Sequence, residues 1–325
     1  MNHETNNRVL VLGSTGFIGR HLVRRLDRLG YRVDALAHSE ADAVRGNIHH
    51  IRGSMEDAPL IRELVARCQY IVHVASLTTP SVSALAPGLE ISGNLHALVQ
   101  LLALSGEFPE RRFVYLSSAG AVYGDIADVA NENASLRPKS YYGAGKVAAE
   151  AFIHACTATS TWKAAILRPS NIYGPEQRMR KGFAIIPTLF YHALAGTTFE
   201  VWGNGETVRD YCHVDDLVDL MVETIKRDTE LPCTICNAAS GETASILALL
   251  AACERTSARK IAVAFRPARS IDAPYVPLAT ESARAAYGWT AKTSLDDGLR
   301  QTWQSLPAPR AEGPRTTEND RRTDS

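Results

Sequence analysis

The chain has 325 residues, and its 35 lysines and arginines balance 35 aspartates and glutamates, so bulk charge does not favour binding to nucleic acid or an anionic membrane. Hydrophobic residues make up 45% and charged residues 22%, ordinary globular values that exclude a disordered or fibrous chain. No apolar run approaches the roughly 18 residues of a membrane helix, the polar N-terminus lacks a signal peptide, and six scattered cysteines make no disulfide framework, so we expect a cytoplasmic protein.

The first half of the chain alternates short apolar segments with amphipathic ones. The expected strands are Arg8–Leu12, Arg32–Ala37, Ile48–Arg52, Tyr70–Ala75, Arg112–Leu116 and Ala164–Leu167. The expected helices are Phe17–Leu29, Pro59–Arg67, about Asn94–Leu104, and Gly143 to about Thr157. Strands that alternate with helices of this length predict an α/β fold with a Rossmann-type, doubly wound parallel sheet.

Beyond about Ile172 the alternation becomes irregular, and Gly/Pro clusters such as Gly174-Pro175 interrupt it. We expect an N-terminal domain over residues 1–170, to which later segments near 205–240 return. A smaller, irregular C-terminal lobe would occupy mainly residues 171–305. Residues 306–325 contain three prolines among charged residues and threonines, so we expect a disordered tail there.

Three glycines separate the first strand from the first helix in Gly13-Ser-Thr-Gly16-Phe-Ile-Gly19. Gly13 permits a tight turn, Gly16 lets the backbone approach a pyrophosphate, and Gly19 lets the helix pack close to the strand. The free N–H groups and the dipole of the helix N-terminus favour phosphate binding. With a strand before and a helix after, this turn predicts that the N-terminal domain binds a dinucleotide.

The acidic residue that usually binds the adenosine ribose should end the second strand. That position holds Ala37, followed by His38, while Asp34 lies inside the strand and is expected to be solvated or locally paired. His38 is a weak substitute for the arginine that a 2′-phosphate prefers. The sequence therefore leaves the choice between NAD and NADP open.

Tyr142 and Lys146 are four residues apart at the start of a predicted helix, so they share one face. A tyrosine with a pKa of about 10 is a poor base at neutral pH. A nearby ammonium and a cationic nicotinamide both favour the phenolate. The pair therefore predicts a proton-transfer device beside a hydride acceptor.

From about Val9 to Thr302 the sequence resembles the extended short-chain dehydrogenase/reductase family of nucleotide-sugar epimerases and dehydratases, and it is most similar to the UDP-glucose 4-epimerase type. The motifs that carry the resemblance are Gly13–Gly19, His73–Ala75, Asn94, Ser117–Gly124, Tyr142 with Lys146, Leu167–Pro175 and Gly203–Tyr211. The resemblance implies a nucleotide-sugar substrate, a tightly bound NAD (with NADP not excluded) and a homodimer formed through the helices that follow Asn94 and Tyr142.

The resemblance also implies roles for particular residues. Tyr142 would be the catalytic acid/base, and Lys146 would hold the nicotinamide ribose and tune the tyrosine. The commonest family register puts the helper serine or threonine at Ala119, so either Ser118, one residue earlier, fills that role or the helper is missing; we assign the role to Ser118. The implied cofactor-binding residues are Gly13, Thr15, Gly16, Phe17, Ile18, Gly19, His38, Ser54, Met55, Val74, Ala75, Ser76, Asn94, Tyr142, Lys146 and Pro169. The implied substrate-binding residues are Ser118, Tyr142, Asn171, Arg209 and Arg269, of which Arg209 and Arg269 would grip the diphosphate.

The residues after the helper position indicate which reaction is run. Dehydratases of the family carry an acidic pair there and decarboxylases carry a glutamate, whereas this chain has Gly120 and Ala121, which cannot exchange protons. The hypothesis is a 4-epimerase that transiently oxidises the sugar at C4. The alternatives are an NADPH-dependent 4-keto-sugar reductase and a non-catalytic dinucleotide-binding sensor. The Cys233/Cys236 pair is expected to be packing rather than a metal site, and no nucleic-acid motif is present.

Overall fold

The computed structural model describes residues 7–38, 43–124, 126, 128–179, 184–267 and 277–307. Arg269 and almost all of the expected tail, from residue 308 onward, lie outside these ranges. Among the described residues, no helix combines the length and the apolar character that crossing a membrane requires.

The largest element of the fold is an eight-stranded sheet with the order β11–β7–β6–β5–β1–β2–β4–β3. Its strands are β1 (Arg8–Leu12), β2 (Arg32–Ala37), β3 (Ala43–Arg45), β4 (Ile48–Arg52), β5 (Tyr70–His73), β6 (Arg112–Leu116), β7 (Lys163–Pro169) and β11 (Cys233–Ala238). Neighbouring strands pair in parallel, except that β3 runs antiparallel to β4 at one edge. The expected α/β fold with a Rossmann-type parallel sheet is confirmed.

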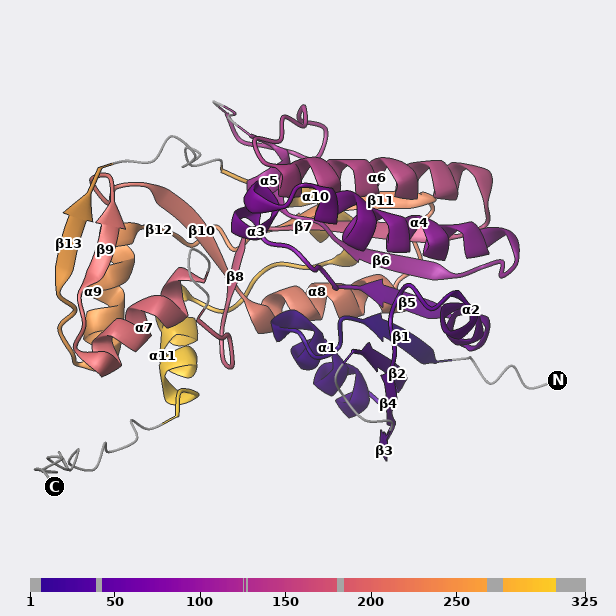
Figure 1. Ribbon diagram of the computed structural model, residues 1–325, viewed down its shortest axis with the longest axis horizontal. Helices are drawn as coiled ribbons and strands as arrows, with labels where there is room; N and C mark the ends of the chain where they lie inside the picture. The colour runs from indigo at the N-terminus through magenta and orange to yellow at the C-terminus, as the bar shows by residue number, and fades with distance from the viewer. Residues whose placement is uncertain are drawn as a thin grey trace, which may run out of the picture.

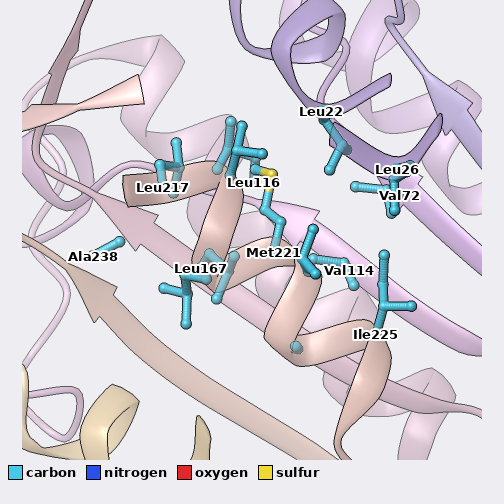
Figure 2. Packing of buried hydrophobic residues seen from close by; sticks show 14 of the residues in the cluster. Leu22, Leu26, Val72, Val114, Leu116, Leu167, Leu217, Met221, Ile225 and Ala238 are labelled. Carbon is cyan, nitrogen blue, oxygen red and sulfur yellow. The ribbon is translucent and has the colours of Figure 1, made fainter. Parts of the chain in front are cut away.

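Helices cover both faces of this sheet (Figure 1). The first face carries α1 (Phe17–Arg28), α8 (Val214–Lys226) and α10 (Glu281–Tyr287), and the second carries α2 (Ala58–Arg67), α4 (His96–Ala103) and α6 (Tyr141–Thr159). Successive side chains of a strand point to opposite faces. Val9 and Val11 of β1 therefore join the first core cluster, whereas Leu10 and Leu12 join the second. Figure 2 shows the first cluster, where Met221 of α8 lies among sheet residues such as Val114 and Leu116.

The remaining strands form two small sheets beside the large one (Figure 1). One contains β8 (Asn171–Tyr173), β10 (Val208–His213) and β12 (Thr243–Ser245), and the other contains β9 (Phe199–Trp202) and β13 (Val263–Arg266). Helices α7 (Ile185–Ala195), α9 (Ile246–Ser257) and α11 (Leu295–Gln304) pack with them around a third apolar cluster. The segment after β10 returns to the large sheet, because α8 covers that sheet and β11 extends it.

One helix differs from the sequence-based expectation. The segment expected to be helical from about Asn94 begins earlier, as the π-helical segment η1 (Glu90–Leu95), and continues through α4 into the 3₁₀ turn η2 (Leu104–Gly106). The expected start at about Asn94 did not include Glu90, which lies one helical turn before it. In the structure Glu90 is buried and accepts a hydrogen bond from the Asn94 side chain. The short helices α3 (Pro80–Leu85) and α5 (Ala119–Val122) complete the described elements.

Candidate active site

A cleft of about 660 Å³ opens at the carboxyl ends of the central strands. In this fold the strand order reverses between β1 and β5, and the loops that follow these two strands diverge there. The loop after β1 contains Gly13 to Gly16, and the loop after β5 contains Val74 to Ser76; both line the cleft. The cleft volume lies in the range of known ligand sites.

The glycine turn Gly13–Gly19 forms one wall of the cleft. Gly13 has φ +91°, and a Cβ there would lie 2.7 Å from the backbone of Ala75, so a side chain would close the gap between the two loops. A Cβ on Gly19 would collide with the carbonyl of Gly13. Gly16 caps α1 without a side-chain hydrogen bond, so the amides of the first helical turn remain available to phosphate oxygens.

Most of the expected cofactor-binding residues come together in this cleft. Those that line it are Gly13, Thr15, Gly16, Phe17, Ile18, Gly19, His38, Ser54, Met55, Val74, Ala75, Ser76, Asn94, Tyr142 and Lys146. Pro169 does not, because it ends β7 in register with Ala238 of β11. The roles of these residues toward a cofactor stay predictions.

The part of the cleft where the adenosine was expected is lined by Ala37, which ends β2, by His38, and by Ser54 after β4. Asp34 does not reach it. Its carboxylate is fully buried and accepts hydrogen bonds from Arg8 (3.0 Å) and Arg67 (2.7 Å). Asp34 is therefore a locally paired structural residue, which is one of the two environments expected for it.

Tyr142 lies in the first turn of α6, which three hydroxyl groups hold in place. The Ser140 hydroxyl caps the helix by accepting from the Gly143 amide at 3.0 Å. The buried Ser83 hydroxyl of α3 accepts from the Tyr142 amide at 3.1 Å. The Ser118 side chain lies within hydrogen-bonding reach of the Tyr142 phenol and acts to lower its pKa. Ser118, rather than Ala119, is thus the residue of this loop that meets the phenol.

Lys146 lies one turn further along α6 and is buried. Its ammonium donates to the Leu116 carbonyl at 2.8 Å and to the Tyr115 hydroxyl at 3.3 Å. It also lies 5.7 Å from the centre of the Tyr142 ring, within the range of a cation–π contact. Burial lowers the pKa of Lys146 to about 8, while the carboxylates of Glu90 and Glu150 act to raise it.

The protein's own residues do not make Tyr142 acidic. Burial raises the pKa of Tyr142 to about 12, the Glu90 carboxylate acts in the same direction, and the Ser118 hydrogen bond opposes both. The sequence predicted a lowered pKa from the Lys146 charge, but that charge also interacts with the face of the Tyr115 ring and is bonded to the Leu116 carbonyl. A further positive charge in the cleft is needed to favour the phenolate.

The expected substrate-binding residues of the C-terminal lobe lie outside the lining of this cleft. Asn171 of β8 pairs in register with Tyr211 of β10, and its amide donates to the Asp210 carbonyl at 2.9 Å. Arg209 of β10 donates to its neighbouring carbonyl, that of Val208, at 2.7 Å. These two residues are on adjacent strands of one small sheet, and Arg269 lies outside the described residues.

Several residues that line or support the cleft escaped the sequence reasoning. The cleft is also lined by Gln177 and Arg178, and Glu90 lines a small neighbouring cavity. The Ser83 hydroxyl fastens the first turn of α6. Glu90 precedes Asn94 by one helical turn, a spacing that could have indicated it.

Cys233 and Cys236 lie in β11 and carry free thiols, and within the described ranges no group of His, Cys, Asp or Glu residues could hold a metal ion.

The parallel sheet carries a glycine turn suited to phosphate and a Tyr/Lys pair, both at the cleft where its strand order reverses. This combination defines a nicotinamide-dinucleotide-dependent enzyme. The model of the NAD dependent epimerase/dehydratase family matches residues 9–239. The chain belongs to this family, and NAD is its cofactor.

Similar proteins share nearly the whole chain. A UDP-glucose 4-epimerase of Cyamopsis tetragonoloba is 28% identical, over 91% of this chain and 93% of that protein. A UDP-glucose 4-epimerase of Mycolicibacterium smegmatis is 28% identical, over 91% of this chain and 97% of its own length. The crystal structure of a Thermotoga maritima UDP-glucose 4-epimerase with UDP-glucose superimposes with a TM-score of 0.85 at 26% identity, covering 92% of this chain and 98% of that one.

Proposed function

We propose that the protein is a nucleotide-sugar 4-epimerase that acts on a UDP-hexose-like substrate. The observation that carries this proposal is the neighbourhood of Tyr142, whose phenol lies within reach of the Ser118 side chain and whose ring lies 5.7 Å from the buried Lys146 ammonium. The residues that follow Ser118 in α5, Ala119 to Ala121, offer no acid to expel a hydroxyl or a carboxyl group. Similar proteins that cover more than nine-tenths of the chain are 4-epimerases, and they do not favour the reductase alternative.

The cleft fits NAD. The missing side chains at Gly13 and Gly19 allow the pyrophosphate turn, and the amides of α1 face it. NAD supplies a reversible hydride acceptor when bound. Its positively charged nicotinamide ring would also provide the charge that Tyr142 needs in order to ionise.

The chain's own groups then handle the proton. Tyr142 takes the proton of the sugar 4-hydroxyl, and Ser118 holds the phenol oxygen in position. Lys146 remains charged below a pH of about 8 and keeps positive charge beside the phenol. The keto sugar then turns over in the pocket, and Tyr142 returns the proton to the opposite epimer.

We further propose that residues 1–170, with segments near 205–240, bind the dinucleotide and that residues 171–305 bind the nucleotide sugar. Asn171 and Arg209 are on neighbouring strands of the smaller lobe, where an amide and a guanidinium suit sugar and diphosphate oxygens. Arg269 would be the second diphosphate ligand.

The test uses purified protein with UDP-glucose, UDP-galactose and their N-acetyl forms, followed by NMR of the anomeric and C4 protons. The expected result is interconversion of the C4 epimers without consumption of added cofactor, abolished in Tyr142→Phe. Mass spectrometry of the released nucleotide should find NAD. Stoichiometric NADPH oxidation with a 4-keto sugar, and no epimerisation, would replace the proposal with the reductase.

We also propose a cytoplasmic homodimer. Apolar side chains are exposed on the helical side formed by η1, α3 and α6: Leu85, Ile91, Tyr141 and Phe152 are 89%, 68%, 57% and 45% exposed. All six cysteines are free, as a reducing compartment would keep them. Sedimentation at micromolar concentration should give twice the monomer mass, and Phe152→Glu should reduce it to one.

A further inference from the structure

Glu90 is a buried acid beside the proposed active site that the mechanism does not use. It begins η1 and is 6% exposed. Its Oε2 accepts a hydrogen bond from the Asn94 side chain at 3.0 Å, while its Oε1 is buried without a hydrogen-bond partner. A buried carboxylate with an unused oxygen is costly, so its retention calls for a role.

The carboxylate fixes Asn94 and, through it, one wall of the cleft. The Asn94 amide nitrogen donates to Glu90 and to the Thr78 hydroxyl at 2.9 Å. Its carbonyl oxygen accepts from the Leu77 amide at 2.9 Å. Leu77 and Thr78 both line the cleft. Glu90 therefore determines which way the Asn94 amide faces and holds the loop after β5 against η1.

A cavity of about 10 Å³ separates Glu90 from Lys146, and it is also lined by His73, Asn94 and Tyr115. This volume holds about one water molecule. The imidazole nitrogens of His73 have no hydrogen-bond partner among the described residues, and burial lowers the pKa of His73 to about 3, so the ring is neutral with one N–H to donate. One water can accept from His73 or from the Tyr115 hydroxyl and donate to the Glu90 Oε1.

Gly145 is what makes room for the acid. A Cβ at position 145 would lie 2.8 Å from the Glu90 Oε2 and 3.3 Å from the Glu90 Cβ. Gly145 directly precedes Lys146 in α6. The acid on η1 and the glycine on α6 are therefore a matched pair across the helix–helix contact, 55 positions apart in the chain.

We propose that Glu90 is a positioning residue of the active site, which orients Asn94 directly and places a negative charge across a one-water cavity from the Lys146 ammonium. This inference rests on the proposed function, since it assigns Glu90 to the Tyr142–Lys146 pair. Glu90 touches neither substrate nor cofactor in this role. It acts through Lys146 and Asn94.

The charge of Glu90 has an effect of predictable sign on the pKa of Tyr142 and on the pKa of Lys146. The titratable groups around Glu90 are Tyr142 and Lys146 from α6, His73 from β5 and Tyr115 from β6, and Glu150 of α6 also acts on Lys146. Glu90 is the only acid of η1 and α4. Its carboxylate raises the pKa of both Tyr142 and Lys146. Without that charge, both ionisations would occur at lower pH.

The first experiment is the pH dependence of kcat/KM for UDP-galactose in Glu90→Gln, which keeps the shape and removes the charge. Both limbs of the profile should move to lower pH, each by about one unit. Glu107→Gln, which removes an exposed carboxylate beyond η2, is the matched control and should leave the profile in place. Limbs that do not move in Glu90→Gln, with activity retained, would overturn the proposal.

The second experiment tests the pairing with Gly145. Gly145→Ala should lower kcat/KM at least tenfold in the native background, because the new methyl group displaces the carboxylate. In the Glu90→Ala background the same substitution should change kcat/KM less than twofold. Equal losses in the two backgrounds would show that position 145 acts independently of Glu90.

A readout without substrate separates this inference from the epimerase proposal. The ultraviolet difference titration between the native protein and Tyr142→Phe reports the ionisation of Tyr142 alone, and Glu90→Gln should shift it to lower pH. A shift in a protein without epimerase activity would refute the proposed function and keep the inference. An active epimerase whose Tyr142 titration does not respond to Glu90→Gln would refute the inference alone.

Discussion

A buried ion pair beneath the active site gives the most quantitative prediction. Arg168 of β7 and Glu150 of α6 are only 2% and 3% exposed. The guanidinium donates to the carboxylate through Nη2 at 2.6 Å and Nε at 3.1 Å, and the Ser117 hydroxyl donates to the same carboxylate. The pair thus connects α6, one turn beyond Lys146, to the central sheet.

Glu150→Ala leaves the Arg168 charge buried without its partner, which costs about 3–5 kcal/mol. Among the described residues, Arg168 then keeps the Tyr123 hydroxyl at 2.9 Å, the face of the Tyr123 ring at 5.1 Å and the Glu132 carbonyl at 3.1 Å, and none of these carries a charge to compensate it. Replacing both members with apolar residues, as in Glu150→Leu with Arg168→Met, removes the uncompensated charge. The double variant should therefore be more stable than Glu150→Ala by at least about 2 kcal/mol.

The assay is urea unfolding followed by far-ultraviolet circular dichroism, with the free energy of unfolding extrapolated to water. A loss of under about 1 kcal/mol in Glu150→Ala would refute the reasoning, because it would mean that water or a nearby group already compensates Arg168. A double variant less stable than Glu150→Ala would also refute it, because the packing of the pair would then matter more than its charge.

Three further predictions concern residues proposed to bind NAD, to bind the nucleotide sugar or to handle the proton. Gly13→Ala should abolish NAD retention after purification, since φ +91° and a Cβ 2.7 Å from the Ala75 backbone both oppose a side chain; stoichiometric NAD by mass spectrometry would contradict this. Arg209→Ala should raise the KM for the nucleotide sugar about 10-fold or more, because one charged hydrogen bond to the substrate is lost. The NAD affinity should stay unchanged, and an unaltered KM would remove Arg209 from the substrate site. Lys146 has a pKa of about 8, lowered from that of a free lysine, so the active ammonium is lost as pH rises and kcat/KM should fall above about pH 8; a plateau extending to pH 10 would argue against this.

The sequence predicted most of the N-terminal domain because its signals are local. Each strand and helix expected there was predicted from apolar residues close together in the chain. The structure has these elements in the expected order, with Gly13–Gly19 at the junction of the first strand and the first helix. The loop serine was also open to sequence reasoning, since Ser117 and Ser118 are the only hydroxyl groups at the end of β6, and the Ser118 side chain contacts Tyr142.

What the sequence could not predict depends on contacts between distant segments. The role of Glu90 depends on the gap at Gly145, and a pattern search finds each without the other. The pKa of Tyr142 depends on how deeply α6 packs, and residue spacing carries no information on burial. Asp34 could be read as solvated or paired until Arg8 and Arg67 were seen to enclose it.

The hydrogen bond between Ser83 and the Tyr142 amide has a consequence for engineering the enzyme. Residues 77–80 line the cleft and run directly into α3, which that bond fastens to the first turn of α6. Libraries that randomise this stretch to change sugar preference will therefore also shift the phenol, so altered selectivity and reduced turnover should arise together. Designs that keep Ser83, Pro80 and Thr79, whose side chain caps α3, and vary only Leu77 and Thr78 should separate the two traits.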